Sequence, residues 1–191
     1  MLTKLRGTYD QWPDLASVAD VEPFIEQSIR EGSDYIKMMN EGGEALGLKA
    51  EGIAQIREDV QAAVCAAARK KNFIVVAHAF SCEDTLAVLN AGIHGTAHTF
   101  YDKPMTPEII AAYKKNNAWC NPTLAGIGSL TGEGKDIQAM FANDDRVKDI
   151  IDQPKRTLLC ACMHMKSPDA QWEYAFDGVR QLKAAGVDII W

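Results

Sequence analysis

The chain alternates short apolar segments with longer amphipathic ones, and this rhythm restricts the folds it can adopt. Residues 21–31 carry apolar side chains at helical spacing, and 34–39 then forms a short apolar run. Residues 73–77 are apolar throughout, which is typical of a strand buried on both faces. Strands that alternate with helices predict parallel βα units, so the fold class is α/β.

The remaining segments continue the same pattern. Strands are predicted over 94–99, 118–124 and 187–191, and a helix is predicted from the capping Ser81 to Gly92. Other helices are predicted within 48–71, from Thr106 to about 116, and over 137–152, 154–165 and 169–185. Residues 40–43 are predicted to be a flexible loop and the glycine-rich 126–136 a surface loop. No other repeat is present, so residues 1–191 are predicted to form a single domain.

Charge and composition exclude several classes of function. The net charge of −6 argues against a nucleic-acid-binding face. No apolar stretch approaches the roughly 18 residues of a membrane span, and the N-terminus shows no signal-peptide pattern. The five cysteines are odd in number, which favours free thiols in a reducing, cytoplasmic environment. The spacing of Cys160, Cys162 and His164 matches no common zinc motif, and this segment is predicted to be helical.

Lys37 is the sharpest candidate for chemistry. It lies within Tyr-Ile-Lys-Met-Met, although lysine is rarely buried unless it is paired or functional. Burial favours the neutral amine, which can add CO₂ to form a carbamate that binds metals through oxygen. The alternative is a lysine at a strand end that extends its ammonium group to solvent.

His78 and His98 each stand near the end of a predicted strand. In a parallel βα fold, catalytic side chains lie at the carboxyl ends of the strands. Imidazole is a preferred zinc ligand, and three protein ligands plus water make a catalytic zinc site. A single histidine here would more often be a hydrogen-bonded core residue. Two on successive strands, after a lysine on the preceding strand, favour a metal site with Lys37, His78 and His98 as ligands and catalytic residues.

Other polar residues border this predicted site. Tyr101 follows His98 on the adjoining loop and Asn121 lies near the end of the next strand, so both are candidate substrate-binding residues. Thr123 has the same position as Asn121, and ordinary loop capping is the alternative for all three. His94 begins its strand, which places it at the opposite end of the sheet and indicates a structural role.

The segments 32–37 and 91–98, together with His78, resemble the amidohydrolase superfamily. The stretch 100–132, with its Asn-Pro-Thr-Leu, is similar to the imidazolonepropionase- and prolidase-like branch. The resemblance implies a (β/α)₈ barrel of the TIM type. It matches Lys37 to the carboxylated lysine of strand four, and His78 and His98 to the ligands of strands five and six.

The sequence also departs from the family pattern. The first-strand His-x-His pair is absent, and the last-strand aspartate would follow Trp191. A complete barrel needs about 250 residues, so the resemblance implies a truncated barrel of about five parallel strands with outer helices. It then implies one divalent metal, with zinc the first choice, or a metal-free acid–base pocket. An open sheet edge invites pairing, which predicts a homo-oligomer or a companion chain that completes the barrel.

Three functions remain open on this basis. The first is an amidohydrolase-derived enzyme that hydrolyses amide-like C–N bonds of a small molecule, or a repurposed relative. The second is a catalytically inactive fragment of a complete hydrolase. The third is a non-enzymatic scaffold that keeps the half-barrel fold. Metal content separates the first from the third.

Overall fold

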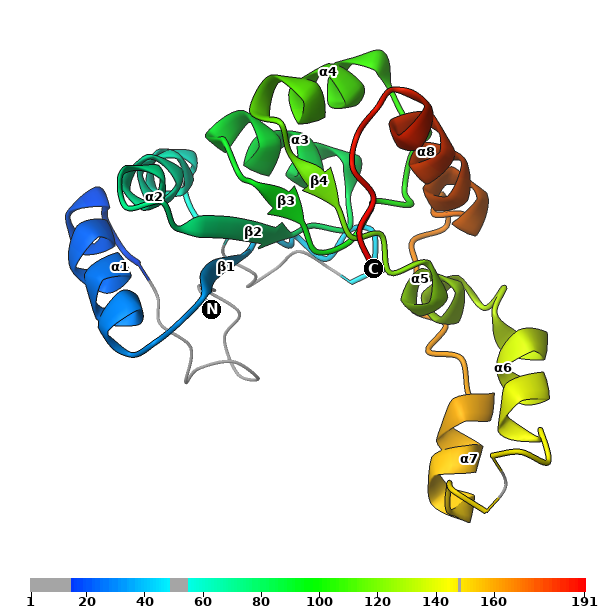
Figure 1. Ribbon diagram of the computed structural model, residues 1–191. Helices are drawn as coiled ribbons and strands as arrows, with labels where there is room; N and C mark the ends of the chain where they lie inside the picture. Colours follow the sequence, from blue (N-terminus) through cyan, green and yellow to red (C-terminus); the bar gives the residue numbers. More distant parts are fainter. Residues whose placement is uncertain (1–14, 49–54, 148) are drawn as a thin grey trace.

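A four-stranded parallel sheet forms the centre of the protein. The computed structural model describes residues 15–48, 55–147 and 149–191 (Figure 1). The sheet contains β1 (Tyr35–Met39), β2 (Ile74–His78), β3 (Gly95–Thr96) and β4 (Trp119–Cys120), in the order β1-β2-β3-β4. Each strand pairs in parallel with the next one along the chain. The predicted α/β fold with parallel strands is therefore confirmed.

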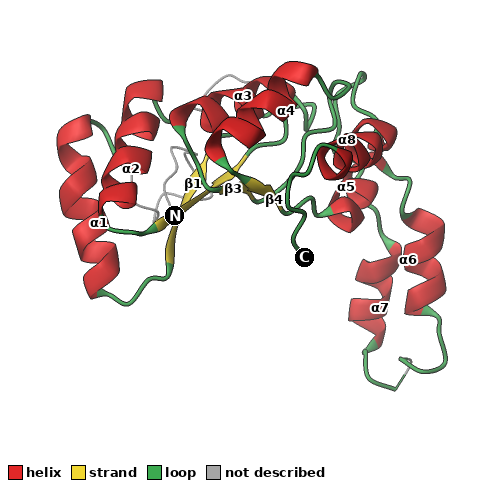
Figure 2. Ribbon diagram, turned by 45° about the horizontal axis from the view of Figure 1, so that its top comes forward, coloured by secondary structure: helices red, strands yellow, loops and turns green. Residues whose placement is uncertain are grey.

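Helices follow the strands and cover one face of the sheet. They are α1 (Val21–Arg30), preceded by the 3₁₀ turn η1 (Val18–Asp20), then α2 (Glu58–Lys70), α3 (Cys82–Ala91) and α4 (Pro107–Asn116). Figures 1 and 2 show α1 to α4 side by side along that face. The residues that begin the helix predicted within 48–71 lie partly outside the described residues. Ser81 caps α3 as predicted, and Thr106, where a helix was predicted to begin, caps α4. In both cases the hydroxyl accepts a backbone N–H from the first turn.

The two faces of the sheet have different surroundings. Lys37 pairs with Val76, and Met39 pairs with His78. Paired residues point to the same face of a sheet, so Lys37 and His78 share a face. Ile36 and Met38 point to the other face and are buried beneath the helices. On the face of Lys37 and His78, Tyr35 is 50% exposed and Ile74 is 45% exposed, so this face is open at the amino-terminal ends of β1 and β2.

Strands β3 and β4 are shorter than predicted. Within 94–99 only Gly95–Thr96 is a strand, and within 118–124 only Trp119–Cys120 is one. Pro122 has no N–H to continue the ladder, and Thr123 takes a left-handed backbone conformation that turns the chain into a helix. In the predicted last strand, only Ile189 pairs, through a parallel bridge to Cys120.

The prediction of a surface loop over 126–136 was wrong. Residues Leu124–Thr131 form helix α5, with Ile127 and Leu130 buried. Apolar side chains recur there at three-residue spacing, and their burial outweighs the conformational cost of the glycines. Gly128 also packs closely, since a Cβ added there would lie 3.5 Å from the indole nitrogen of Trp172.

The last third of the chain contains three more helices. Helices α6 (Lys135–Ala142) and α7 (Gln153–Cys160) are shorter than predicted and project away from the sheet as a hairpin (Figures 1 and 2). Residues 161–165, predicted to continue a helix, have no regular secondary structure, and His164 has a positive φ of 49° that no α-helix accommodates. Helix α8 (Trp172–Ala184) contacts α5.

Candidate functional site

Two of the predicted site residues lie at the carboxyl ends of neighbouring strands, and the third, Lys37, lies in the middle of β1. Lys37 is half-buried in β1, His78 is the last residue of β2, and His98 follows β3 by two residues. The ring centroids of His78 and His98 are 4.7 Å apart, with an edge-to-face angle of 83°. The positive charge of Lys37 contributes to lowering the pKa of His98. The structure therefore brings the two imidazoles into contact and places Lys37 on the same face of the sheet as His78.

Phe80 packs against both histidine rings. Its centroid is 4.6 Å from that of His78 at an angle of 74°, and 4.7 Å from that of His98 at 30°. The phenyl ring therefore stacks on His98 and meets His78 by an edge. Phe80 was not among the predicted site residues. An aromatic side chain two positions after a site histidine was the only sequence signal for it.

Glu41 is a further site residue that the sequence analysis did not identify. Its Oε2 lies 3.1 Å from Nε2 of His78, and both residues are buried. A carboxylate can only accept a hydrogen bond, so Nε2 of His78 carries a proton. The signal was a carboxylate directly after β1, within a segment predicted to be flexible.

The loop that carries Glu41 is held in place by hydrogen bonds. The backbone N–H of Gly43 donates to Oε1 of Glu41 over 2.8 Å. Asp84, on the first turn of α3, accepts from the N–H of Gly42 and from the side-chain amide of Asn40, both over 3.3 Å. Asn40 is 2% exposed and Glu41 is 5% exposed. The loop predicted to be flexible is thus buried and tied to a helix.

Asp84 is itself an unusual carboxylate. Burial, with a smaller contribution from the negative charge of Glu41, raises its pKa from 3.8 to about 6. Hydrogen bonds from Gln55 and from the backbone of Gly42 oppose that rise. Two buried carboxylates therefore lie close to each other behind His78, and the surrounding donors offset much of their repulsion.

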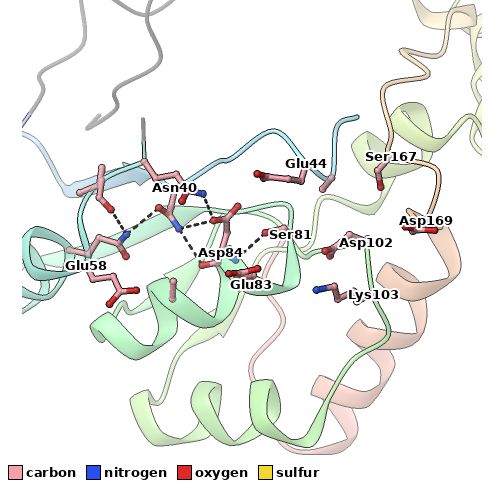
Figure 3. Close-up of a pocket in the computed structure, with 15 residues that line it drawn as sticks. Asn40, Glu44, Glu58, Ser81, Glu83, Asp84, Asp102, Lys103, Ser167 and Asp169 are labelled. Atoms are coloured by element: carbon pink, nitrogen blue, oxygen red, sulfur yellow. Dashed lines mark hydrogen bonds between the residues drawn. The ribbon is translucent and has the colours of Figure 1, made fainter. Parts of the chain in front are cut away.

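A cleft of about 630 Å³ lies beside this loop (Figure 3). Six carboxylates and one lysine are among the residues that line it: Glu44, Glu58, Glu83, Asp84, Asp102, Asp169 and Lys103. Figure 3 shows Asn40 and Asp84 joined by hydrogen bonds at one side of the cleft. Neither His78 nor His98 lines it. The acidic cleft and the histidine pair are therefore separate features. Asn40 and Asp84, which are hydrogen-bonded to each other, line the cleft.

His98 is held by a neutral partner instead of a carboxylate. Its Nδ1 lies 2.6 Å from Oγ1 of Thr123. Burial, together with the charges of His78 and Lys37, lowers its pKa from 6.5 to about 3. The ring is therefore neutral at physiological pH. Among the described residues, Nε2 of His98 has no hydrogen-bond partner.

Tyr101 and Asn121 lie at the edges of this group. Tyr101 is fully buried, its hydroxyl donates to the carbonyl of Met165 over 3.4 Å, and burial raises its pKa above the ordinary value. Asn121 is half-buried, and its backbone N–H donates to the carbonyl of Thr96. Their role as substrate-binding residues stays a prediction. His94 lies at the other end of the sheet, where its Nδ1 accepts the N–H of Val75 over 3.0 Å.

Comparison with known proteins identifies the architecture. No family model matches the sequence, and no curated protein matches it. Among solved structures, a candidate prolidase from Bifidobacterium longum superposes with a TM-score of 0.63 at 20% identity, over 98% of this chain and 41% of that one. A Xaa-Pro dipeptidase with bound methionine gives 0.58 at 17% identity, over 96% and 42%. The ochratoxinase of A. niger gives 0.57 at 18% identity, over 91% and 33%.

The chain therefore shares the fold of part of these prolidase-like structures and of part of a solved amidohydrolase that is 18% identical to it. It spans less than half the length of each of these solved chains. The prediction of a partial TIM-type barrel with outer helices is therefore confirmed, with four strands and one additional bridge at Ile189 among the described residues.

Proposed function

We propose that the protein is a metal-dependent hydrolase of amide-like C–N bonds in a small molecule. One divalent ion, zinc in our proposal, would be held by Lys37, His78 and His98. The observation that supports this most strongly is the contact of His78 and His98 at the carboxyl ends of β2 and the β3 segment, on the sheet face that Lys37 shares with His78. That edge is where enzymes with a TIM barrel carry their catalytic residues.

The chemistry of the donors fits such an ion. Among the described residues, no cluster of three or more His, Cys, Asp or Glu side chains has metal-binding geometry, so the lysine has to supply the third ligand. Glu41 holds the proton of His78 on Nε2, which leaves Nδ1 as the ligand atom. His98 is neutral and offers Nε2. Two imidazole nitrogens and the oxygen of a carbamate on Lys37 suit zinc, and a ligand histidine whose second nitrogen bonds a carboxylate is a common arrangement.

When bound, zinc would supply Lewis-acid activation of the scissile carbonyl. The residues of the chain would position the ligands and shield the reaction from water. Phe80 covers the histidine rings. Asn121 would offer its amide to a substrate, and Tyr101 would shape the wall beneath. The names of the structural neighbours support a dipeptide-like substrate, since one is a Xaa-Pro dipeptidase and another is a prolidase in complex with N-methylphosphonate-L-proline.

A metal-free acid–base pocket is the second candidate, and the electrostatics favour it less. A general base works best when its pKa lies near the operating pH. The pKa of His98, at about 3, is too low for an efficient base at neutral pH, whereas a neutral imidazole suits a metal ligand. This observation places the metal-dependent reading first.

The environment of the site supports two further proposals. Among the described residues, β1 pairs only with β2, so its other edge is free to pair. We propose that a second copy of the chain or a companion chain covers this edge and completes the barrel.

All five cysteines are free, which suits a reducing compartment, and we propose a cytoplasmic location. No described helix combines the length and apolarity that a membrane crossing would require.

The first test is elemental analysis of protein purified without chelators. We expect about one zinc per chain in the natural protein and none in Lys37→Ala, His78→Ala or His98→Ala. An active metal site would justify a screen of amide, ester and dipeptide substrates. If all three variants kept the natural metal content and activity, the proposed site would be wrong. If none of the proteins held metal, the metal-dependent reading would fall.

A further inference from the structure

Thr123 has a backbone conformation that its side chain does not favour. Its φ of 49° and ψ of 42° lie in the left-handed region. A side chain branched at Cβ is a true outlier there. Asn72 and Asn117 also have left-handed backbones, but asparagine tolerates this conformation. Thr123 is therefore the one β-branched residue with a positive φ in the part of the chain that the structure describes.

Thr123 does not cap its helix through its hydroxyl, as a threonine at the start of a helix ordinarily does. Ser81 and Thr106 precede α3 and α4 with extended backbones, and their hydroxyls accept N–H groups of the first helical turn. Thr123 precedes α5, but its side chain makes no such capping bond. Its hydroxyl lies against Nδ1 of His98 at 2.6 Å. The same residue type therefore serves two different tasks within one chain.

We propose that Thr123 is a positioning residue for His98. In this inference, which rests on the proposed function, the N–H at Nδ1 donates to the threonine hydroxyl and Nε2 faces the site with its lone pair. Stacking on Phe80 fixes the plane of the imidazole but permits its two flipped orientations. The hydrogen bond to Thr123 selects one of them. The left-handed backbone at Thr123 is what carries the hydroxyl to His98.

The test compares four substitutions at one position. Thr123→Ser keeps the hydroxyl, and Thr123→Val keeps the shape without it. Thr123→Ala and Thr123→Gly both lack the hydroxyl but differ in their tolerance of a left-handed backbone. The first readout is the tautomer of His98 in metal-free protein at pH 7, from long-range ¹H–¹⁵N spectra. The second is the dissociation constant for Zn²⁺, and the third is the midpoint of urea unfolding.

We expect the natural protein and Thr123→Ser to show His98 with its proton on Nδ1, and Thr123→Val to show a mixture of tautomers. Zn²⁺ binding should weaken about tenfold to 100-fold in Thr123→Val, Thr123→Ala and Thr123→Gly, as for other residues that orient a ligand, and by less than about threefold in Thr123→Ser. Thr123→Gly should unfold at a higher urea concentration than Thr123→Ala, because glycine adopts a positive φ without strain.

The outcomes separate this inference from the proposed function. If His98→Gln weakened Zn²⁺ binding while Thr123→Val did not, the metal site would stand and the positioning role would be wrong. If the natural protein did not bind Zn²⁺, the proposed function would fail, and the tautomer measurement would still decide the role of Thr123. An unchanged tautomer in Thr123→Val would overturn it. A Thr123→Ala variant as stable as Thr123→Gly would contradict the strained backbone.

Discussion

The two histidines of the candidate site are held by opposite means. His78 donates to a buried carboxylate, Glu41, on a loop that Asp84 ties to α3. His98 contacts the neutral hydroxyl of Thr123 and stacks on Phe80. The first histidine therefore depends on negative charge and several backbone donors, and the second depends on shape and a single neutral bond.

The difference has an electrostatic consequence. The carboxylate at His78 fixes its tautomer and increases the electron density at Nδ1. His98 has no carboxylate partner among the described residues, and the charges of Lys37 and His78 oppose its protonation. One imidazole thus gains electron density from a carboxylate, while the surroundings of the other keep it neutral. His98 can therefore bind a cation without first losing a proton.

Removal of either ring gives the largest expected effect. His78→Gln and His98→Gln should each weaken Zn²⁺ binding by at least about 100-fold, more than the loss of a residue that only orients a ligand. Isothermal titration of metal-free protein with Zn²⁺ measures this change, with His94→Gln as the control at the far end of the sheet. A large loss for only one of the two variants would mean that the two histidines do not share an ion.

Removal of the charge behind His78 should have the next largest effect. Glu41→Gln keeps the size of the side chain but replaces a carboxylate with an amide. Zn²⁺ binding should then weaken about tenfold to 100-fold. Glu44→Gln is the matched control, because Glu44 is an exposed carboxylate on the same loop. Equal effects of the two substitutions would indicate a general loss of negative charge instead of a specific partner for His78.

Loosening the loop that carries Glu41 should have a smaller effect. Asp84→Asn leaves one oxygen to accept from Gly42, Asn40 and Gln55, so at least one donor loses its acceptor. We expect Zn²⁺ binding to weaken about threefold to tenfold, because Asp84 lies one step beyond a residue that orients a ligand. Hydrogen exchange of the Gly42 amide should accelerate in the same variant.

Glu83→Gln controls for the change of charge in that experiment. Glu83 is exposed, lies beside Asp84 on the first turn of α3 and lines the same acidic cleft. The two substitutions therefore remove the same charge from nearly the same place. If Gly42 exchanged at the natural rate in Asp84→Asn, the loop would be held by its burial alone.

The parts of this site that the sequence predicted are those set by local rules. Strand and helix alternate, so the carboxyl ends of the strands, and with them His78 and His98, could be located without a structure, as could Lys37 within the preceding strand. The caps at Ser81 and Thr106 follow from the same kind of local chemistry. The carboxylates behind His78 could not be found in this way. The contact between Gly42 and Asp84 joins two βα units, and no spacing in the sequence encodes it.

The segment after β4 was harder to predict because distant contacts decide its structure. Glycines at 126, 128, 132 and 134 indicated a loop, but Ile127 and Leu130 are buried in a cluster with Tyr101 and Ala175. Ala175, on α8, helps to bury these two side chains, and this burial stabilises helix α5. Tyr101 was predicted to border the site for a local reason, and this cluster is what buries it.

The smallest expected effect is the pH dependence of stability in the natural, metal-free protein. The pKa of Asp84 is raised from 3.8 to about 6, so its contribution to stability is complete below pH 3.8 and is lost as the pH rises through 6. The pKa of His98 is lowered from 6.5 to about 3, so its contribution is present above pH 6.5 and is lost as the pH falls toward 3. Between pH 4.5 and 5.5, roughly, the two slopes oppose each other.

Each group alone would change the free energy of unfolding by up to about 1.4 kcal/mol per pH unit. Urea unfolding at several pH values should therefore give a stronger loss of stability on acidification for Asp84→Asn than for the natural protein. His98→Gln should instead gain stability on acidification relative to the natural protein, and Glu83→Gln should follow the natural curve. If both substitutions shifted the slope in the same direction, the contrast between a charged and a neutral support for the two histidines would be wrong.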